Sequence, residues 1–140
     1  LEGLARIGER NALNAVLVRA ISDRSPVVRL ASAFARARVG DFGDLGLIAD
    51  GFRSADLQEN AFNYLVELGP IVAPALAGAA TARDARVRAG IAEVLGIIGS
   101  AASWPVLETL TRDRDRSVAA AAVRSQQRLS ARQPGVARTP

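Results

Sequence analysis

Apolar and small residues recur along the chain at the spacing of one face of an α-helix. In the segment "VRAGIAEVLGIIG", residues 87–99, positions 0, +4, +7 and +11 from the first valine are Val87, Ile91, Val94 and Ile98. Residues at these spacings lie on one side of a helix, because the helix turns every 3.6 residues. The pattern therefore predicts an amphipathic helix with one buried face.

The same window occurs again in the sequence. Windows start at residues 28, 57, 87 and 118, and the other three read "VRLASAFARARVG", "LQENAFNYLVELG" and "VAAAAVRSQQRLS". Their predicted core positions are Val28, Ser32, Ala35, Val39, Leu57, Ala61, Tyr64, Leu68, Val118, Ala122, Ser125 and Leu129. A period of about 30 residues indicates a repeat protein. The chain also opens on "LARIG", which reads as the tail of one more copy ending at Gly8.

Glycines mark these windows in two ways. Gly40, Gly69 and Gly99 end three of them, and a glycine just past a helix suits a left-handed cap. Gly90 and Gly96 fall inside the third window, where each costs about 1 kcal/mol relative to alanine. We expect both to be positions where a neighbouring helix leaves no room for a Cβ.

Shorter apolar segments separate the windows and complete the predicted helix pairs, at residues 11–21, 42–52, 70–80 and 103–111. Ser25 followed by Pro26 reads as an N-cap and a first helical position. A single pair cannot bury its apolar face, whereas stacked pairs share one continuous core. No alternating strand pattern competes with this interpretation.

The predicted fold is therefore all-α, an α-solenoid of about four to five helix pairs over residues 1–130. Its units are expected at about 1–24 (partial), 25–53, 54–83, 84–114 and 115–130. Residues 131–140 are polar and contain two prolines and a glycine, so we expect a short, flexible, disordered C-terminal tail.

The windows that begin with valine and arginine resemble the short bacterial HEAT-like repeats, the type also found in phycobilisome lyases. The resemblance covers roughly residues 1–130. It implies an α-solenoid whose window helices line the concave surface, and a ladder of Asp–Arg contacts between repeats. The ladder arginine is present at Arg29 and Arg88 but replaced by Gln58 and Ala119, so the ladder is expected to be broken at alternate steps.

Under that orientation, window positions +2, +6 and +10 face the concavity and form the candidate protein-binding site. Its residues are Leu30, Phe34, Arg38, Glu59, Asn63, Glu67, Glu93, Ile97, Arg124 and Arg128. They predict a groove with an apolar and basic first end, an acidic middle and a basic last end. We expect Leu30 and Phe34 to be exposed apolar anchors. The alternatives are that Phe34 packs on a neighbouring unit and that the charges are merely solvated.

The amino-acid composition excludes several classes of function. The chain has no histidine and no cysteine, so the usual ligands of zinc and the imidazole base of a hydrolase triad are absent. We therefore expect no cofactor, no metal and no enzymatic activity. The predicted function is a protein–protein interaction scaffold, whose partner is a protein segment or another domain of the parent chain.

Two alternatives stay open. The first is a nucleic-acid-binding module that uses the C-terminal arginines Arg112, Arg114, Arg116, Arg124, Arg128 and Arg132. The acidic middle of the groove and an aromatic content of 4% argue against nucleic acid. The second is an accessory protein of the lyase type. The turn "TRDRDRS", residues 111–117, is interpreted as a solvated turn with local ion pairs that contribute little.

The sequence also allows expectations about membrane insertion and about the N-terminal end of the chain. No run of about 18 apolar residues is found, so no membrane insertion is expected within this segment. The chain starts at Leu1 and is expected to be a fragment, so its compartment is undetermined, with the cytoplasm as the default. An open N-terminal end would expose Leu1, Leu4 and Ile7, which predicts self-association there.

Overall fold

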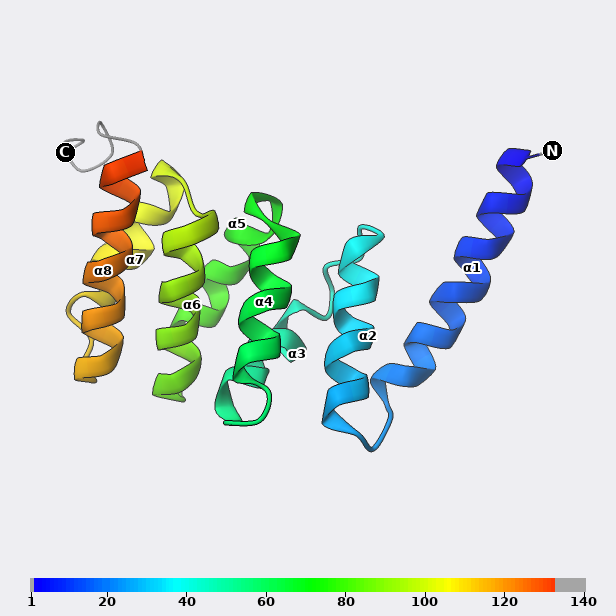
Figure 1. Ribbon diagram of the computed structural model, residues 1–140, viewed down its shortest axis with the longest axis horizontal. Helices are drawn as coiled ribbons and strands as arrows, with labels where there is room; N and C mark the ends of the chain where they lie inside the picture. Colours follow the sequence, from blue (N-terminus) through cyan, green and yellow to red (C-terminus); the bar gives the residue numbers. More distant parts are fainter. Residues whose placement is uncertain (1, 133–140) are drawn as a thin grey trace.

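Four long helices form one layer of the protein. The computed structural model describes residues 2–132, and the regular elements in this range are all helical (Figure 1). The layer consists of α2 (Pro26–Arg38), α4 (Gln58–Leu68), α6 (Ala85–Ile98) and α8 (Arg116–Arg132). These helices coincide with the four predicted windows, and their N-terminal ends lie along the same edge of the molecule (Figure 1).

A second layer of shorter helices lies behind the long ones. It comprises α3 (Leu45–Asp50), η1 (Gly51–Arg53), η2 (Pro70–Val72), α5 (Ala73–Leu76), η3 (Ala77–Thr81), η4 (Ala101–Ser103) and α7 (Trp104–Leu110). Pro70, Pro74 and Pro105 each stand in the first turn of such an element, where the missing N–H costs nothing. The two layers alternate along the chain, which confirms an all-α, solenoid-like arrangement.

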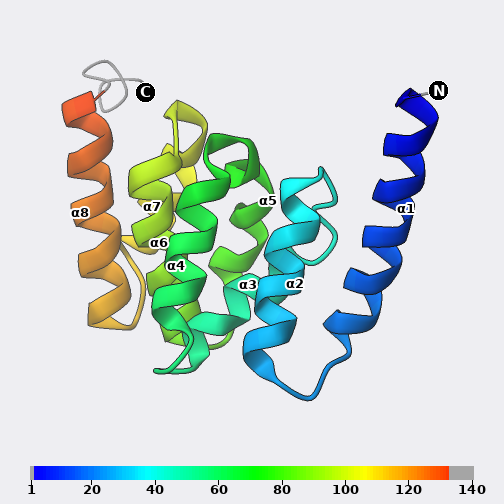
Figure 2. The same cartoon turned by 45° about the vertical axis from the view of Figure 1, so that its right-hand side comes forward.

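The first helix departs from the predicted pattern. α1 (Glu2–Ile21) is one continuous helix, so the expected break after Gly8 is wrong. An interior glycine costs only about 1 kcal/mol, and Glu9 rather than a proline follows Gly8, whereas Pro70 follows Gly69 directly. Toward its N-terminal end, α1 leans away from α2 (Figure 2).

The core is centred on α6 and α8. Val87, Ile91, Val94 and Ile98 of α6 are each at most 5% exposed, as the spacing predicts. The corresponding residues of α8 are also buried, namely Val118, Ala122, Ser125 and Leu129. The pattern therefore identifies the buried face correctly in the last two repeats.

The buried face of α2 matches the prediction only in part, because Ser32 is 5% exposed as expected but two other predicted positions lie at the surface. Val28 and Val39, which were expected in the core, are 38% and 44% exposed, while Leu30 is only 3% exposed. Val28 lies in the first turn of α2 and Val39 is its C-cap, so neither is covered on all sides. Leu30 instead packs toward Gly51, where an added Cβ would come within 3.2 Å of the leucine Cδ1. The expectation of an exposed Leu30 anchor is therefore wrong.

The terminal glycines follow the prediction in two of three cases. Gly40 and Gly69 have φ values of +96° and +79°, which an L side chain rarely adopts. Gly99 has a φ of −71° and is not left-handed. It is required for space, because a Cβ there would lie 2.2 Å from the Leu95 carbonyl oxygen.

The two interior glycines of α6 are close-packing positions, as expected. A Cβ on Gly90 would lie 2.4 Å from the Phe52 ring, and a Cβ on Gly96 would lie 2.4 Å from the Ser125 Oγ. Ser125 Oγ also donates a 2.6 Å hydrogen bond to the Ala92 carbonyl oxygen. The glycines thus let α6 approach η1 on one side and α8 on the other.

Two further predictions concern the C-terminal end and the membrane. α8 continues through Ala131 and Arg132, so the predicted tail does not begin at residue 131, and residues 133–140 lie outside the described range. Within residues 2–132, no single helix is long and apolar enough to span a membrane. Helix α4 with residues 70–81 meets that test only as a pair bent by 100°, by length and composition alone.

Candidate functional site

A groove of about 510 Å³ crosses three consecutive long helices near their N-terminal ends. It is lined by Phe52, Gln58, Glu59, Phe62, Arg86, Ala89, Gly90, Glu93, Ser117, Ala121 and Arg124. We call it the three-helix groove, after α4, α6 and α8. It brings together Glu59, Glu93 and Arg124 of the sequence-predicted site.

The floor of the three-helix groove is apolar. Phe52 of η1 is 6% exposed and lies behind Gly90 of α6, and Phe62 of α4 is half-buried beside it. Ala89 and Ala121 line α6 and α8, where their small side chains leave the space open. A concave surface with an apolar floor and a few polar groups at its rim is the usual form of a binding site.

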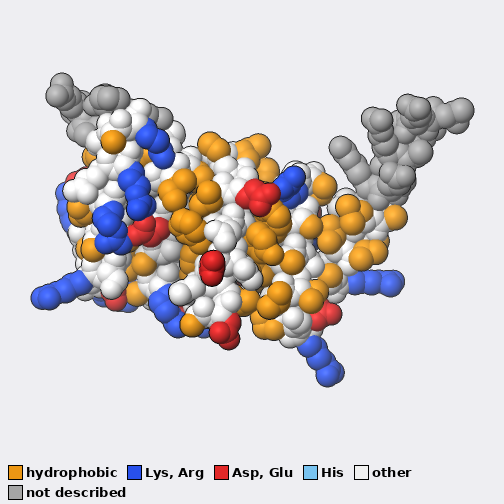
Figure 3. Space-filling view, viewed as in Figure 1, with side chains coloured by type: hydrophobic (Ala, Val, Ile, Leu, Met, Phe, Trp, Pro, Cys, Tyr) orange, Lys and Arg blue, Asp and Glu red, His pale blue; other side chains and the backbone are white. Residues whose placement is uncertain are grey.

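The rim carries opposite charges at its two ends. Glu59 is exposed in the first turn of α4, and no ion pair among residues 11–17 and 19–132 includes it. At the other end, Glu93 Oε1 accepts from Arg124 Nη2 at 2.5 Å, and its Oε2 accepts from Arg128 Nη1 at 2.9 Å. Acidic side chains accordingly gather over α4 and basic ones over α8, with apolar groups between them (Figure 3).

The remaining predicted site residues lie outside the groove. Arg38 Nη1 donates to Glu67 Oε1 at 2.8 Å, and both side chains are more than half exposed. Asn63 is exposed on α4, and Ile97 is half-buried against the core. The acidic middle of the predicted groove therefore retains Glu59 as its uncompensated charge, since Glu67 is paired.

Phe34 packs on the next repeat. Its ring stacks on Tyr64 of α4 with the ring centroids 4.3 Å apart and an interplanar angle of 11°. The Arg38 guanidinium carbon lies 5.8 Å from the centroid of the Phe34 ring, within range of a cation–π contact. Of the two alternatives that the sequence left open for Phe34, packing on a neighbouring unit is the one observed.

Sequence reasoning missed several lining residues. Phe62 stands at window position +5 and Arg86 one residue before a window, and only +2, +6 and +10 were assigned to this face. Because a helix face is wider than a single stripe, position +5 could have been included. Phe52 lies in a connecting element, which the repeat pattern does not place.

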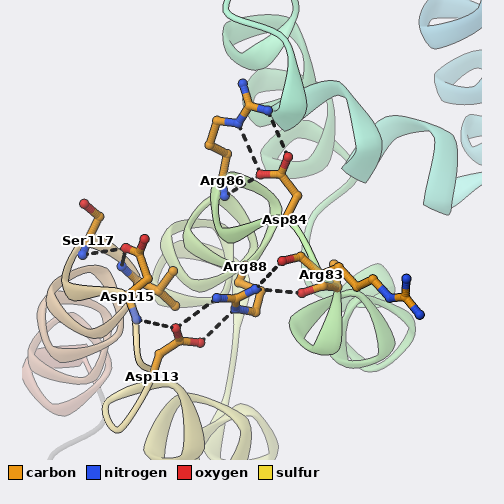
Figure 4. Close-up of polar contacts among 9 residues, drawn as sticks. Arg83, Asp84, Arg86, Arg88, Asp113, Asp115 and Ser117 are labelled. Carbon is orange, nitrogen blue, oxygen red and sulfur yellow. Dashed lines mark hydrogen bonds and ion pairs between the residues drawn. The ribbon is translucent and has the colours of Figure 1, made fainter.

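A buried ion pair connects α6 to the turn that precedes α8. Arg88 Nε and Nη2 donate to Asp113 Oδ2 and Oδ1 at 2.8 and 3.0 Å (Figure 4). Arg88 Nη1 also donates to the carbonyl oxygens of Ala82 and Arg83. The side chains of the pair are 8% and 10% exposed, so the expectation of a merely solvated turn is wrong for Asp113.

Two aspartates beside these contacts have lowered pKa values. Hydrogen bonds from the Arg88 guanidinium hold the pKa of Asp113 below its usual value, although burial opposes the shift. Asp84, the N-cap of α6, accepts from the Arg86 side chain and backbone N–H (Figure 4). These hydrogen bonds lower the pKa of Asp84 to about 2. Both carboxylates are thus ionised at neutral pH. Asp84 caps α6 directly, whereas Asp113 accepts the backbone N–H of Asp115, which itself accepts from the start of α8.

In the first repeat, Arg29 makes the backbone-carbonyl contacts that Arg88 makes, without the aspartate. Arg29 Nη1 donates to the carbonyl oxygens of Asp23 and Arg24 at 2.6 and 3.2 Å, which repeats the carbonyl contacts of Arg88. In the next repeat, however, Phe52 stands five residues before the window start, where Asp113 stands before the last window. The Asp–Arg ladder contact therefore forms at Arg88. At the corresponding aspartate position of the earlier repeat stands Phe52, which forms part of the groove floor.

The arginines considered for nucleic acid are mostly engaged within the protein. Arg112 donates to Glu108 at 3.1 Å, and Arg124 and Arg128 share Glu93. Arg132 donates to the carbonyl oxygens of Ile97 and Gly99. The described residues include no cluster of three or more His, Cys, Asp or Glu side chains that could hold a metal ion.

Comparison with known proteins places this architecture in a family. The family model for HEAT repeats matches residues 45–126. The chain belongs to the HEAT-repeat family. The HEAT match begins at α3 and ends within α8, so it contains the groove helices α4 and α6 in full. No curated protein and no solved structure matches the chain. HEAT repeats generally mediate contacts between proteins, because a stack of repeats presents an extended surface.

Proposed function

We propose that this HEAT-repeat chain is a non-catalytic protein-binding scaffold. The three-helix groove holds a segment of another protein or of another domain of the parent chain. The observation that carries the proposal is the groove itself, which crosses three consecutive repeats with an apolar floor and a charged rim. Glu59, Glu93 and Arg124 are the site residues of this proposal, and Arg128 joins them through Glu93.

We also assign the repeats to the short bacterial type. The period of about 30 residues and the valine–arginine starts at residues 28 and 87 support this assignment. The ion pair between Arg88 and Asp113 supports it as well, because Arg88 is a ladder arginine and its partner is an aspartate in the turn before the next window. The assignment concerns the architecture of the repeats, and the binding function rests on the groove.

Filling the groove tests the proposed function. Ala89→Phe places a ring into the groove from α6, whereas Ala131→Phe adds the same ring to an exposed site at the far end of α8. A displayed library of random peptides is selected on the wild-type protein, and the selected peptides are measured on both variants. We expect affinity to fall about tenfold or more on Ala89→Phe and to be unchanged on Ala131→Phe. Failure to select any peptide, or equal binding to both variants, would contradict the proposal.

A further inference from the structure

We propose that the segment held in the three-helix groove has a defined order of side chains. A basic residue lies over Glu59, an apolar residue enters the floor, and an acidic residue lies over Arg124 and Arg128. This inference rests on the proposed function, because it names the chemistry of the occupant of the same site.

The apolar floor of the groove determines the middle residue of the bound segment, which is apolar. Phe52 replaces the ladder aspartate of its repeat and packs against Gly90, so a carboxylate is exchanged for an aromatic surface. Phe62, Ala89 and Ala121 extend the apolar surface across the three helices. A volume of about 510 Å³ is enough for one large apolar side chain with its flanking backbone.

The acidic end is defined by Glu59. The other carboxylates on this face are neutralised, since Glu67 pairs with Arg38 and Glu93 pairs with two arginines. Glu59 lines the groove and is exposed, and the ion pairs of the described residues do not include it. A cationic side chain of a bound segment would supply the partner that the described residues do not provide.

The basic end has more positive than negative charge. Arg124 and Arg128 share the single carboxylate of Glu93, and their side chains are 53% and 48% exposed. Arg132, one turn further along α8, donates only to the backbone oxygens of Ile97 and Gly99 among its described contacts. An acidic side chain can therefore bind at this end without displacing Glu93, because each guanidinium has further N–H donors.

The charge order favours a partner segment over the tail of this chain. Residues 133–140 read "QPGVARTP", which offers Val136 and Arg138 but no acidic residue for the α8 end. Each exposed charge pair contributes modestly, roughly two- to five-fold in affinity, so the two ends act mainly as selectors of sequence and orientation. The apolar side chain supplies most of the binding.

A peptide library with a fixed central leucine and randomised flanking positions tests the order of side chains. It is selected in parallel on the wild type, on Glu59→Arg and on Asp50→Arg. Asp50 is exposed on α3, outside the groove lining, and its reversal is a matched change of charge. We expect the wild type and Asp50→Arg to enrich peptides with a basic residue on one side of leucine and an acidic residue on the other. Glu59→Arg is expected to enrich acidic residues on both sides.

The outcomes separate the inference from the proposed function. Some selected peptides could bind the wild type and lose affinity on Ala89→Phe but show no charge preference. That result would overturn the inference and leave the proposed function standing. If no peptide is selected, both fail. A dimer seen by sedimentation and lost in Glu59→Arg would mean that a second copy fills the groove, which overturns the inference. Because Glu59 lies in the first turn of α4, Glu59→Gln serves as a milder variant, expected to lose the basic preference without gaining an acidic one.

Discussion

Arg88 in α6 and Asp113 in the turn before α8 form a two-bond ion pair that joins α6 to that turn. The pair lies near the N-terminal ends of α6 and α8, where Arg88 is in the first turns of α6 and Asp113 precedes α8. Asp113 Oδ1 also accepts the backbone N–H of Asp115, which in turn caps α8 through Ser117 and Val118. One carboxylate thus links α6 to the turn at the start of the last helix.

Removing the charge of Asp113 should therefore destabilise the protein strongly. Asp113→Asn leaves the Arg88 guanidinium largely buried without a counter-ion, which we expect to lower the free energy of unfolding by about 3 kcal/mol. Urea unfolding followed by circular dichroism measures the loss. Arg112→Ala, which breaks an exposed pair with Glu108, is the control and should cost less than about 1 kcal/mol. Equal losses of unfolding free energy in the two variants would show that the buried ion pair stabilises the protein no more than the exposed one.

The lowered pKa values of Asp84 and Asp113 predict how stability depends on pH. The ordinary value for aspartate is 3.8, and Asp84 has a pKa of about 2 in the folded protein. Between about pH 4 and pH 2 the unfolded chain therefore binds protons that the folded protein does not bind, so the free energy of unfolding falls as the pH falls. Above about pH 5 this contribution is fully present and constant.

Urea midpoints measured from neutral pH down to about pH 2 check this dependence. Asp113→Asn should show a shallower fall than the wild type, because one of the shifted groups is gone. A midpoint that rises on acidification, or an identical slope in the variant, would contradict the assignment.

The interior glycines of α6 predict a reversal of the usual helix preference. Gly90→Ala brings a Cβ within 2.4 Å of the Phe52 ring, so we expect a loss of about 1–3 kcal/mol in spite of alanine's better propensity. Gly46 lies within α3 and has no atom within 4 Å of its Cβ position. Gly46→Ala should therefore gain about 0.5–1 kcal/mol. Thermal unfolding of both variants compares them, and a gain in Gly90→Ala would mean that α6 does not approach Phe52 so closely.

Phe34 should matter for stability and not for binding in the groove. Phe34→Ala removes a ring stacked on Tyr64 at the junction of two repeats, which we expect to cost about 2 kcal/mol. The affinity for groove-selected peptides should be unchanged, because Phe34 does not line the groove. A variant of native stability that loses peptide binding would restore Phe34 as a binding anchor.

The repeat and its helices could be predicted from the sequence because they are local properties. The period of the apolar positions places α2, α4, α6 and α8, and prolines place the starts of the short helices. The continuous α1 could not be predicted in the same way. Gly8 matches the window ends in sequence, but a helix breaks there only if another contact stabilises the break.

The candidate site was predicted only in part, because its decisive contacts join different repeats. The window pattern selects Glu59, Glu93 and Arg124 correctly as residues of one face, since they share a helical register. It does not show that two arginines share Glu93, or that Leu30 turns inward onto Gly51. Those facts depend on how closely neighbouring helices approach, which side-chain spacing along one helix does not determine.

Binding in the three-helix groove is tested most directly by titrating the isotope-labelled protein with a groove-selected peptide and recording amide NMR spectra at each step. Binding in the three-helix groove predicts that the shifted amides cluster at the starts of α4, α6 and α8, around Glu59, Ala89 and Ser117. It predicts small changes in the short helices α3, α5 and α7. Shifts concentrated on α3, α5 and α7, or spread evenly over the chain, would contradict binding in the three-helix groove.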